Sequence, residues 1–112
     1  MRKLALILLA AGAIGSNAAA APSDYPTAAL ADYVFGCMAS NGQTPDTLRR
    51  CSCSIDVIAS IIPYEKYVQA ETVLSMSQVP GERTGIFRQV PWLQEVVKQV
   101  RQAQAEAEVR CF

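Results

Sequence analysis

The sequence predicts an all-α fold, a small disulfide-stapled bundle of about four helices, on three observations. Four cysteines follow an N-terminal segment that is typical of an export signal. Apolar residues recur at helical spacing through four stretches, and each stretch opens at a proline. No stretch alternates apolar and polar residues as a half-buried strand would.

The N-terminal segment predicts export. A charged start, Met1 to Lys3, precedes an apolar stretch over residues 4–15 and a run of small residues over 16–21. The apolar stretch is shorter than the roughly 20 residues that span a bilayer, which favours a cleaved signal over a membrane anchor. We therefore expect residues 1–20 to be a signal peptide and residues 21–112 to form a single helical domain. The mature protein is expected to be periplasmic or secreted, with no membrane attachment after cleavage.

Prolines mark the expected helix starts, because proline is favoured in the first helical turn and disfavoured further in. The clearest start is Thr44-Pro45-Asp46, a threonine cap followed by proline and an acidic residue at the positive end of the helix dipole. Asn41-Gly42 closes the preceding helix, since both residues tolerate left-handed geometry. The expected helices span about 26–41, 45–62, 63–77 and 91–110.

The second expected helix is apolar on two faces. One face carries Leu48, Cys51, Ile55, Ile58 and Ile62, and another carries Cys53, Val57 and Ile61. Residues two apart lie about 200° apart around a helix axis, so Cys51 and Cys53 should point to different partners. A helix of this kind packs between neighbours.

Export and an even cysteine count predict two disulfides with no free thiol. Cys37 shares a stripe of the first helix with Leu30 and Val34, and an antiparallel hairpin brings it beside Cys51. Cys111 ends an apolar stripe of the last helix. It is the remaining partner for Cys53. We favour Cys37–Cys51 with Cys53–Cys111; the alternative, Cys37–Cys53 with Cys51–Cys111, stays open. The last stripe comprises Leu93, Val97, Val100, Ala107 and Cys111, with Trp92 expected as a core anchor at its start.

Composition excludes several classes of function. The chain has ten basic and ten acidic residues and no histidine. Without histidine there is no Ser-His or Cys-His catalysis and no histidine-ligated metal. Without a basic run there is no footprint for nucleic-acid binding. We expect no catalytic residue, no metal and no cofactor. Glu65, Glu71 and Glu82 are interpreted as solvated surface rather than as an acid/base or cation site.

The longest irregular stretch, residues 81–90, is our candidate contact loop. It holds two glycines, two arginines and a phenylalanine. Partner contact is therefore assigned to Arg83, Phe87 and Arg88.

Five segments carry a resemblance to a known family: Phe35-Gly36-Cys37-Met38, residues 51–59 and 67–72, Pro80-Gly81-Glu82-Arg83 and Arg110-Cys111-Phe112. Together they resemble a family of small exported bacterial proteins with a CxC pair and four cysteines. Its members occur in gene neighbourhoods of PQQ-dependent methanol and alcohol dehydrogenases. The resemblance implies an accessory role beside a periplasmic quinoprotein dehydrogenase or its cytochrome partner, and it carries over no catalytic residue.

Three classes of function remain. The favoured one is a non-catalytic accessory or interaction protein that binds another periplasmic protein. The second is a periplasmic chaperone of the acid-stress kind, which would have to sense pH through carboxylates. The third is a thiol-based metal carrier or redox protein that uses Cys51 and Cys53.

Overall fold

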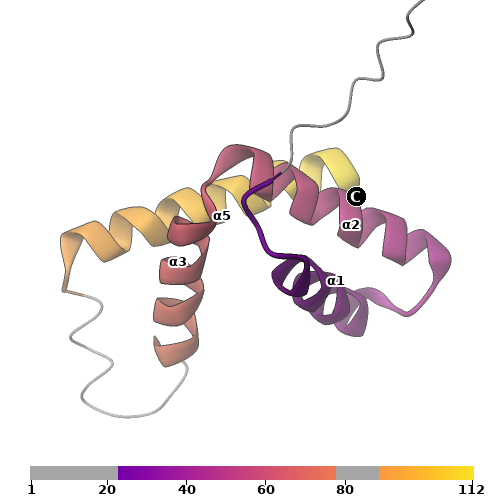
Figure 1. Ribbon diagram of the computed structural model, residues 1–112, viewed down its shortest axis with the longest axis horizontal. Coiled ribbons are helices and arrows are strands. Elements are labelled where there is room, and N and C mark those ends of the chain that lie inside the picture. The colour runs from indigo at the N-terminus through magenta and orange to yellow at the C-terminus, as the bar shows by residue number, and fades with distance from the viewer. Residues whose placement is uncertain (1–22, 78–88) are drawn as a thin grey trace, which may run out of the picture.

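The computed structural model describes residues 23–77 and 89–112, which form four α-helices and no strand (Figure 1). The predicted all-α, disulfide-stapled bundle is confirmed. The predicted helix ends differ from the observed ones by one residue at most. The helices are α1 (Thr27–Asn41), α2 (Pro45–Ile61), α3 (Tyr64–Ser77) and α5 (Pro91–Cys111).

The junction between α1 and α2 follows the predicted chemistry. The Thr44 hydroxyl accepts a hydrogen bond from the backbone N–H of Thr47 at 3.1 Å, which caps α2, and Pro45 is the first residue of the helix. At the end of α1, Gly42 has a φ of 106°, a conformation that side-chain-bearing residues rarely adopt. Its N–H donates to the Met38 carbonyl at 2.9 Å and so satisfies the last turn of the helix.

The centre of the fold is the pairing of α2 with α5, which run in opposite directions (Figure 1). On α2, Ile55 and Ile58 are almost completely buried. On α5, Val100, Ala103 and Ala107 are buried in the same core cluster. Helix α3 packs on α5, and helix α1 packs on α2. Both α1 and α3 lie on the same side of the α2–α5 pair (Figure 1).

Tyr25 joins the starts of α1 and α3. Its side chain is 5% exposed, and its hydroxyl donates to the Ile62 carbonyl at 3.1 Å. Its ring packs edge-on against Tyr64, with the centroids 5.1 Å apart, and at a tilt against Tyr67, with the centroids 5.3 Å apart. The neighbouring Asp24 carboxylate accepts from the Tyr64 N–H at 3.0 Å, where a negative charge favours the first turn of α3. Burial raises the pKa of Tyr25 well above its usual value, so the hydroxyl stays a neutral donor.

Three expectations about packing are wrong. Trp92 is 57% exposed rather than a core anchor, and Leu48 is 47% exposed rather than part of the buried face of α2. In the apolar stripe of α5, the buried residue is Val96 rather than the predicted Val97, which is only half-buried. Trp92 precedes Leu93, the first buried residue of α5, and one residue is about 100° around the helix. The buried stripe is Leu93, Val96, Val100, Ala103 and Ala107.

Candidate functional site

The four cysteines form two disulfides, Cys37–Cys51 and Cys53–Cys111, which leaves no free thiol. These are the bonds of the favoured pairing. The first bond fastens α1 to α2, and the second fastens the end of α5 to α2. A CxC pair with both sulfurs bonded offers neither a metal ligand nor a nucleophile, because both chemistries require the thiolate.

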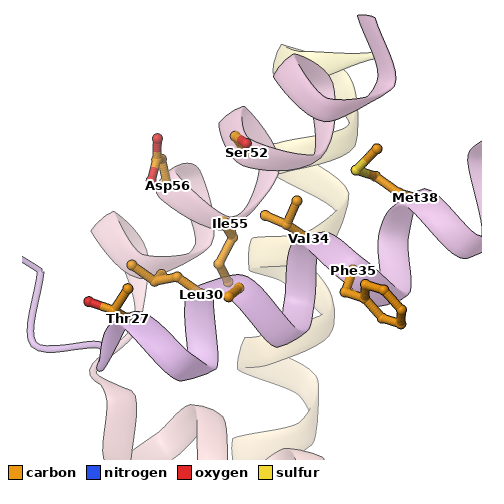
Figure 2. A pocket seen from close by; sticks show the side chains of 9 residues that line it. Thr27, Leu30, Val34, Phe35, Met38, Ser52, Ile55 and Asp56 are labelled. Carbon is orange, nitrogen blue, oxygen red and sulfur yellow. The ribbon is translucent and has the colours of Figure 1, made fainter. Parts of the chain in front are cut away.

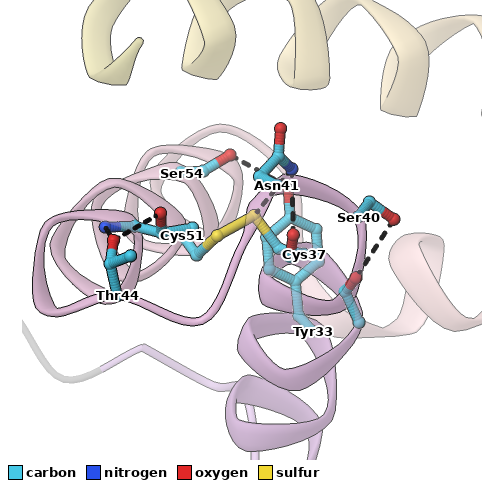
Figure 3. Close-up of a disulfide and its surroundings, with 9 residues drawn as sticks. Tyr33, Cys37, Ser40, Asn41, Thr44, Cys51 and Ser54 are labelled. Atoms are coloured by element: carbon cyan, nitrogen blue, oxygen red, sulfur yellow. Dashed lines mark hydrogen bonds between the residues drawn. A yellow bond between two sulfur atoms is a disulfide. The ribbon is translucent and has the colours of Figure 1, made fainter.

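The residues around the Cys37–Cys51 bond make hydrogen bonds that stabilise α1 and its packing on α2 (Figure 3). Cys51 is completely buried. The Asn41 side-chain amide donates to the Cys37 carbonyl at 2.9 Å, which supports the last turn of α1. Tyr33 on α1 and Ser54 on α2 share a hydrogen bond of 2.9 Å between their hydroxyls. The bridge and this hydrogen bond both hold α1 against α2.

Helix α1 depends on these links because it contributes no buried residue to the core. Its apolar side chains Leu30, Val34 and Met38 are only half-buried. The Phe35 ring is 74% exposed. Full burial of such a side chain stabilises a protein by about 1.5–3 kcal/mol. Most of this stabilisation is not realised for Phe35 in the isolated chain, because its ring is mostly exposed.

An apolar hollow of about 440 Å³ lies between α1 and α2. In Figure 2, Leu30, Val34 and Ile55 lie between the two helices, while the Phe35 ring points away from α2. Asp56 supplies the one charged group of the lining. A concave, mostly apolar surface with few polar groups is typical of a binding site. We call it the α1–α2 hollow.

The predicted contact residues are not part of this surface. Arg83, Phe87 and Arg88 lie outside the residues that the structure describes. Of the three glutamates interpreted as solvated surface, Glu65 is exposed, Glu71 is half-buried and Glu82 lies outside the described residues. Burial and the nearby charge of Asp32 raise the pKa of Glu71, so this carboxylate is less well solvated than that of Glu65.

Sequence reasoning missed the α1–α2 hollow, although Phe35 and Met38 flank Cys37 in the sequence. The signal was present in α1, which is apolar on more sides than a single packing partner can cover. Within the described ranges, no group of three cysteine, aspartate or glutamate residues is arranged to hold a metal ion. None of the helices in those ranges combines the length and hydrophobicity that a bilayer span requires.

No family model, no curated protein and no solved structure matches this chain. The fold and the two bonds define an all-α, disulfide-stapled domain of the kind found in oxidising compartments. Arguments about function therefore rest on the chain's own surfaces.

Proposed function

We propose that this protein is an exported, non-catalytic accessory protein that binds another protein of the periplasm. Export is supported by the sequence of residues 1–21 and by two disulfides, which persist in oxidising compartments and are rare in the cytosol. A binding role is supported by the bonded cysteines and by the absence of histidine, which remove the thiol nucleophile and the imidazole base.

The α1–α2 hollow carries the proposal. It is apolar, concave and bordered by the exposed Phe35 ring. Exposed aromatic side chains beside a hollow are typical of the central contacts of protein interfaces. The disulfide and the Tyr33–Ser54 hydrogen bond fix α1 in place, so little conformational entropy is lost when a partner binds.

The proposed partner is a PQQ-dependent alcohol dehydrogenase or its cytochrome. This part of the proposal rests on the resemblance described above, and so does the accessory role. Arg83, Phe87 and Arg88 are proposed as a second contact for the same partner.

The test is affinity capture from a periplasmic extract of the native host with the oxidised mature protein as bait. A Phe35→Ser/Met38→Ser variant removes two side chains at the hollow. The matched control is Val109→Ser, because Val109 is 84% exposed and is not part of the hollow. We expect one specific partner, retained by the control and lost by the double variant. Equal capture by all three proteins would exclude the hollow as the contact surface.

Two further measurements complete the test. Purified quinoprotein dehydrogenase and its cytochrome are assayed separately for binding, and failure of both would remove the proposed partner. Sedimentation of the free protein then shows whether a second copy covers the hollow instead. Turnover of a small substrate by the purified protein would contradict the non-catalytic class.

A further inference from the structure

A second depression lies on the side of α1 that faces α3 and the end of α5. It consists of three adjoining parts of about 560, 400 and 230 Å³. The first two parts share Asp32, Tyr67 and Glu71, and the last two share Tyr33 and Gln104. The parts therefore adjoin one another, with α1 on one side and α3 and α5 on the other. We call it the α1–α3–α5 cleft.

All the charges that line this cleft are negative. Asp32 on α1, Glu71 on α3 and Glu108 on α5 are the charged residues of its lining, and no lysine or arginine among the described residues joins them. The neighbouring Lys66 instead donates to the Gln99 side chain at 3.2 Å, outside the cleft. No ion pair within the described ranges neutralises these three carboxylates.

The walls between the carboxylates are aromatic. Tyr33 comes from α1, and Tyr64 and Tyr67 come from α3. Phe112 lies at the far end, where the Arg50 guanidinium is already 6.0 Å from the centroid of its ring. The Tyr64 and Tyr67 rings stack with centroids 6.4 Å apart. The face of an aromatic ring attracts a cation. Exposed carboxylates alone would be ordinary solvated surface, but here they are combined with a concave, aromatic wall.

The Glu71 carboxylate is held in an unfavourable setting. Its pKa is raised first by burial and then by the negative charge of Asp32. The groups that face it are the Asp32 carboxylate on α1 and the Tyr67 hydroxyl on α3, while the Tyr33 hydroxyl is bonded to Ser54 on α2. None of these groups carries a positive charge. A cation between Asp32 and Glu71 would relieve their mutual repulsion.

We propose that the α1–α3–α5 cleft binds a cationic segment of another polypeptide. Its lysine or arginine side chains lie between Asp32 and Glu71, with their alkyl parts against Tyr67. The amides of Asn41 and Gln104 line the cleft between the carboxylates and supply partners for a peptide backbone, which a polyamine lacks. Anionic ligands are disfavoured by all three carboxylates.

This site is independent of the proposed function, because the α1–α2 hollow lies on a different face of α1 and shares no residue with the cleft. Loss of capture by the Phe35→Ser/Met38→Ser variant tests the hollow. The experiment below tests the cleft, so either site can fail while the other stands.

The experiment is an NMR titration of the oxidised mature protein. The probes are a capped nine-residue peptide that alternates arginine with leucine, the same peptide with glutamate for arginine, and spermidine. We expect the arginine peptide to shift the amide signals of residues that line the cleft, and the glutamate peptide to leave them unchanged. Binding of spermidine with equal affinity would overturn the assignment of a polypeptide, and no binding of the arginine peptide would overturn the site.

Paired variants separate the cleft from a general charge effect. Asp32→Asn/Glu71→Gln removes two of the carboxylates without changing side-chain shape, and should weaken peptide binding roughly tenfold or more. Glu65→Gln/Glu95→Gln removes the same charge from exposed residues outside the cleft and should change binding by no more than about threefold. Circular dichroism checks that each variant is folded. Equal weakening in both variants would refute the proposal.

Discussion

Removal of the Cys53–Cys111 bond should destabilise the fold by about 4 kcal/mol. The bond joins residues 58 apart in the sequence, and the chain-entropy relation for a loop of that length gives roughly 4 kcal/mol. The Cys37–Cys51 bond, with a separation of 14, corresponds to about 3 kcal/mol. The two closed loops do not overlap along the chain, so their effects on the unfolded state are separate. A Cys53→Ala/Cys111→Ala variant isolates the longer one.

The assay is thermal and urea unfolding of the oxidised mature protein, followed by circular dichroism at neutral pH. For a domain of this size, a loss of about 4 kcal/mol corresponds to a fall in melting temperature of roughly 15–30 °C. Cys53 and Cys111 are only half-buried, so little of the loss comes from packing. The control is Val109→Ala, an exposed change two residues from Cys111, which should stay within about 0.5 kcal/mol of wild type. A loss below about 1 kcal/mol in the double variant would refute the reasoning.

Three further predictions concern single side chains, each measured by unfolding against wild type. Tyr25→Phe should cost about 1–2 kcal/mol, because it removes the hydrogen bond to the buried Ile62 carbonyl; no change would mean that this bond is not formed in solution. Thr44→Ala should cost about 1 kcal/mol through loss of the cap on the Thr47 N–H, and Thr44→Ser should restore it. Glu71→Gln should stabilise the fold at neutral pH, because the raised pKa of Glu71 in the folded protein means that ionisation of this carboxyl opposes folding. The free energy of unfolding of the wild type should therefore rise as the pH falls through that pKa. Position 71 of the variant does not ionise, so it should contribute no such pH dependence. A variant less stable than wild type at neutral pH would contradict the last prediction.

The helices and their order were predictable because local chemistry determines them. Proline fixes the start of α2 at Pro45, and Thr44 and Gly42 satisfy the backbone groups on either side of the turn. The sequence excluded a direct bond within the CxC pair, because its two cysteines point to different sides of a helix. It favoured one of the two remaining pairings, and the structure decides between them.

The packing phase of α5 was not predictable, since adjacent valines at 96 and 97 are equally suited to the core. The choice depends on the tertiary contacts with α2 and α3, which bury Val96 more fully. The same contacts bury Leu93, and they leave its neighbour Trp92 exposed despite the hydrophobic character of the Trp92 side chain.

The sequence of α1 indicates that some apolar surface stays uncovered, but it locates neither of the two surfaces. Phe35 was not singled out because α1 is apolar on several sides and the sequence does not indicate which side is left uncovered. The carboxylates of the α1–α3–α5 cleft come from three different helices, at Asp32, Glu71 and Glu108. No spacing along the chain relates them, so only the three-dimensional arrangement brings them together.

Photo-crosslinking at position 35 in the native host is the most direct test of the binding role. A photoreactive phenylalanine analogue replaces Phe35, whose ring is 74% exposed, and the control carries the same analogue at Val109, which is 84% exposed. The account predicts one discrete adduct with another periplasmic protein from position 35 and none from position 109. No adduct from position 35, or the same adducts from both positions, would contradict the account.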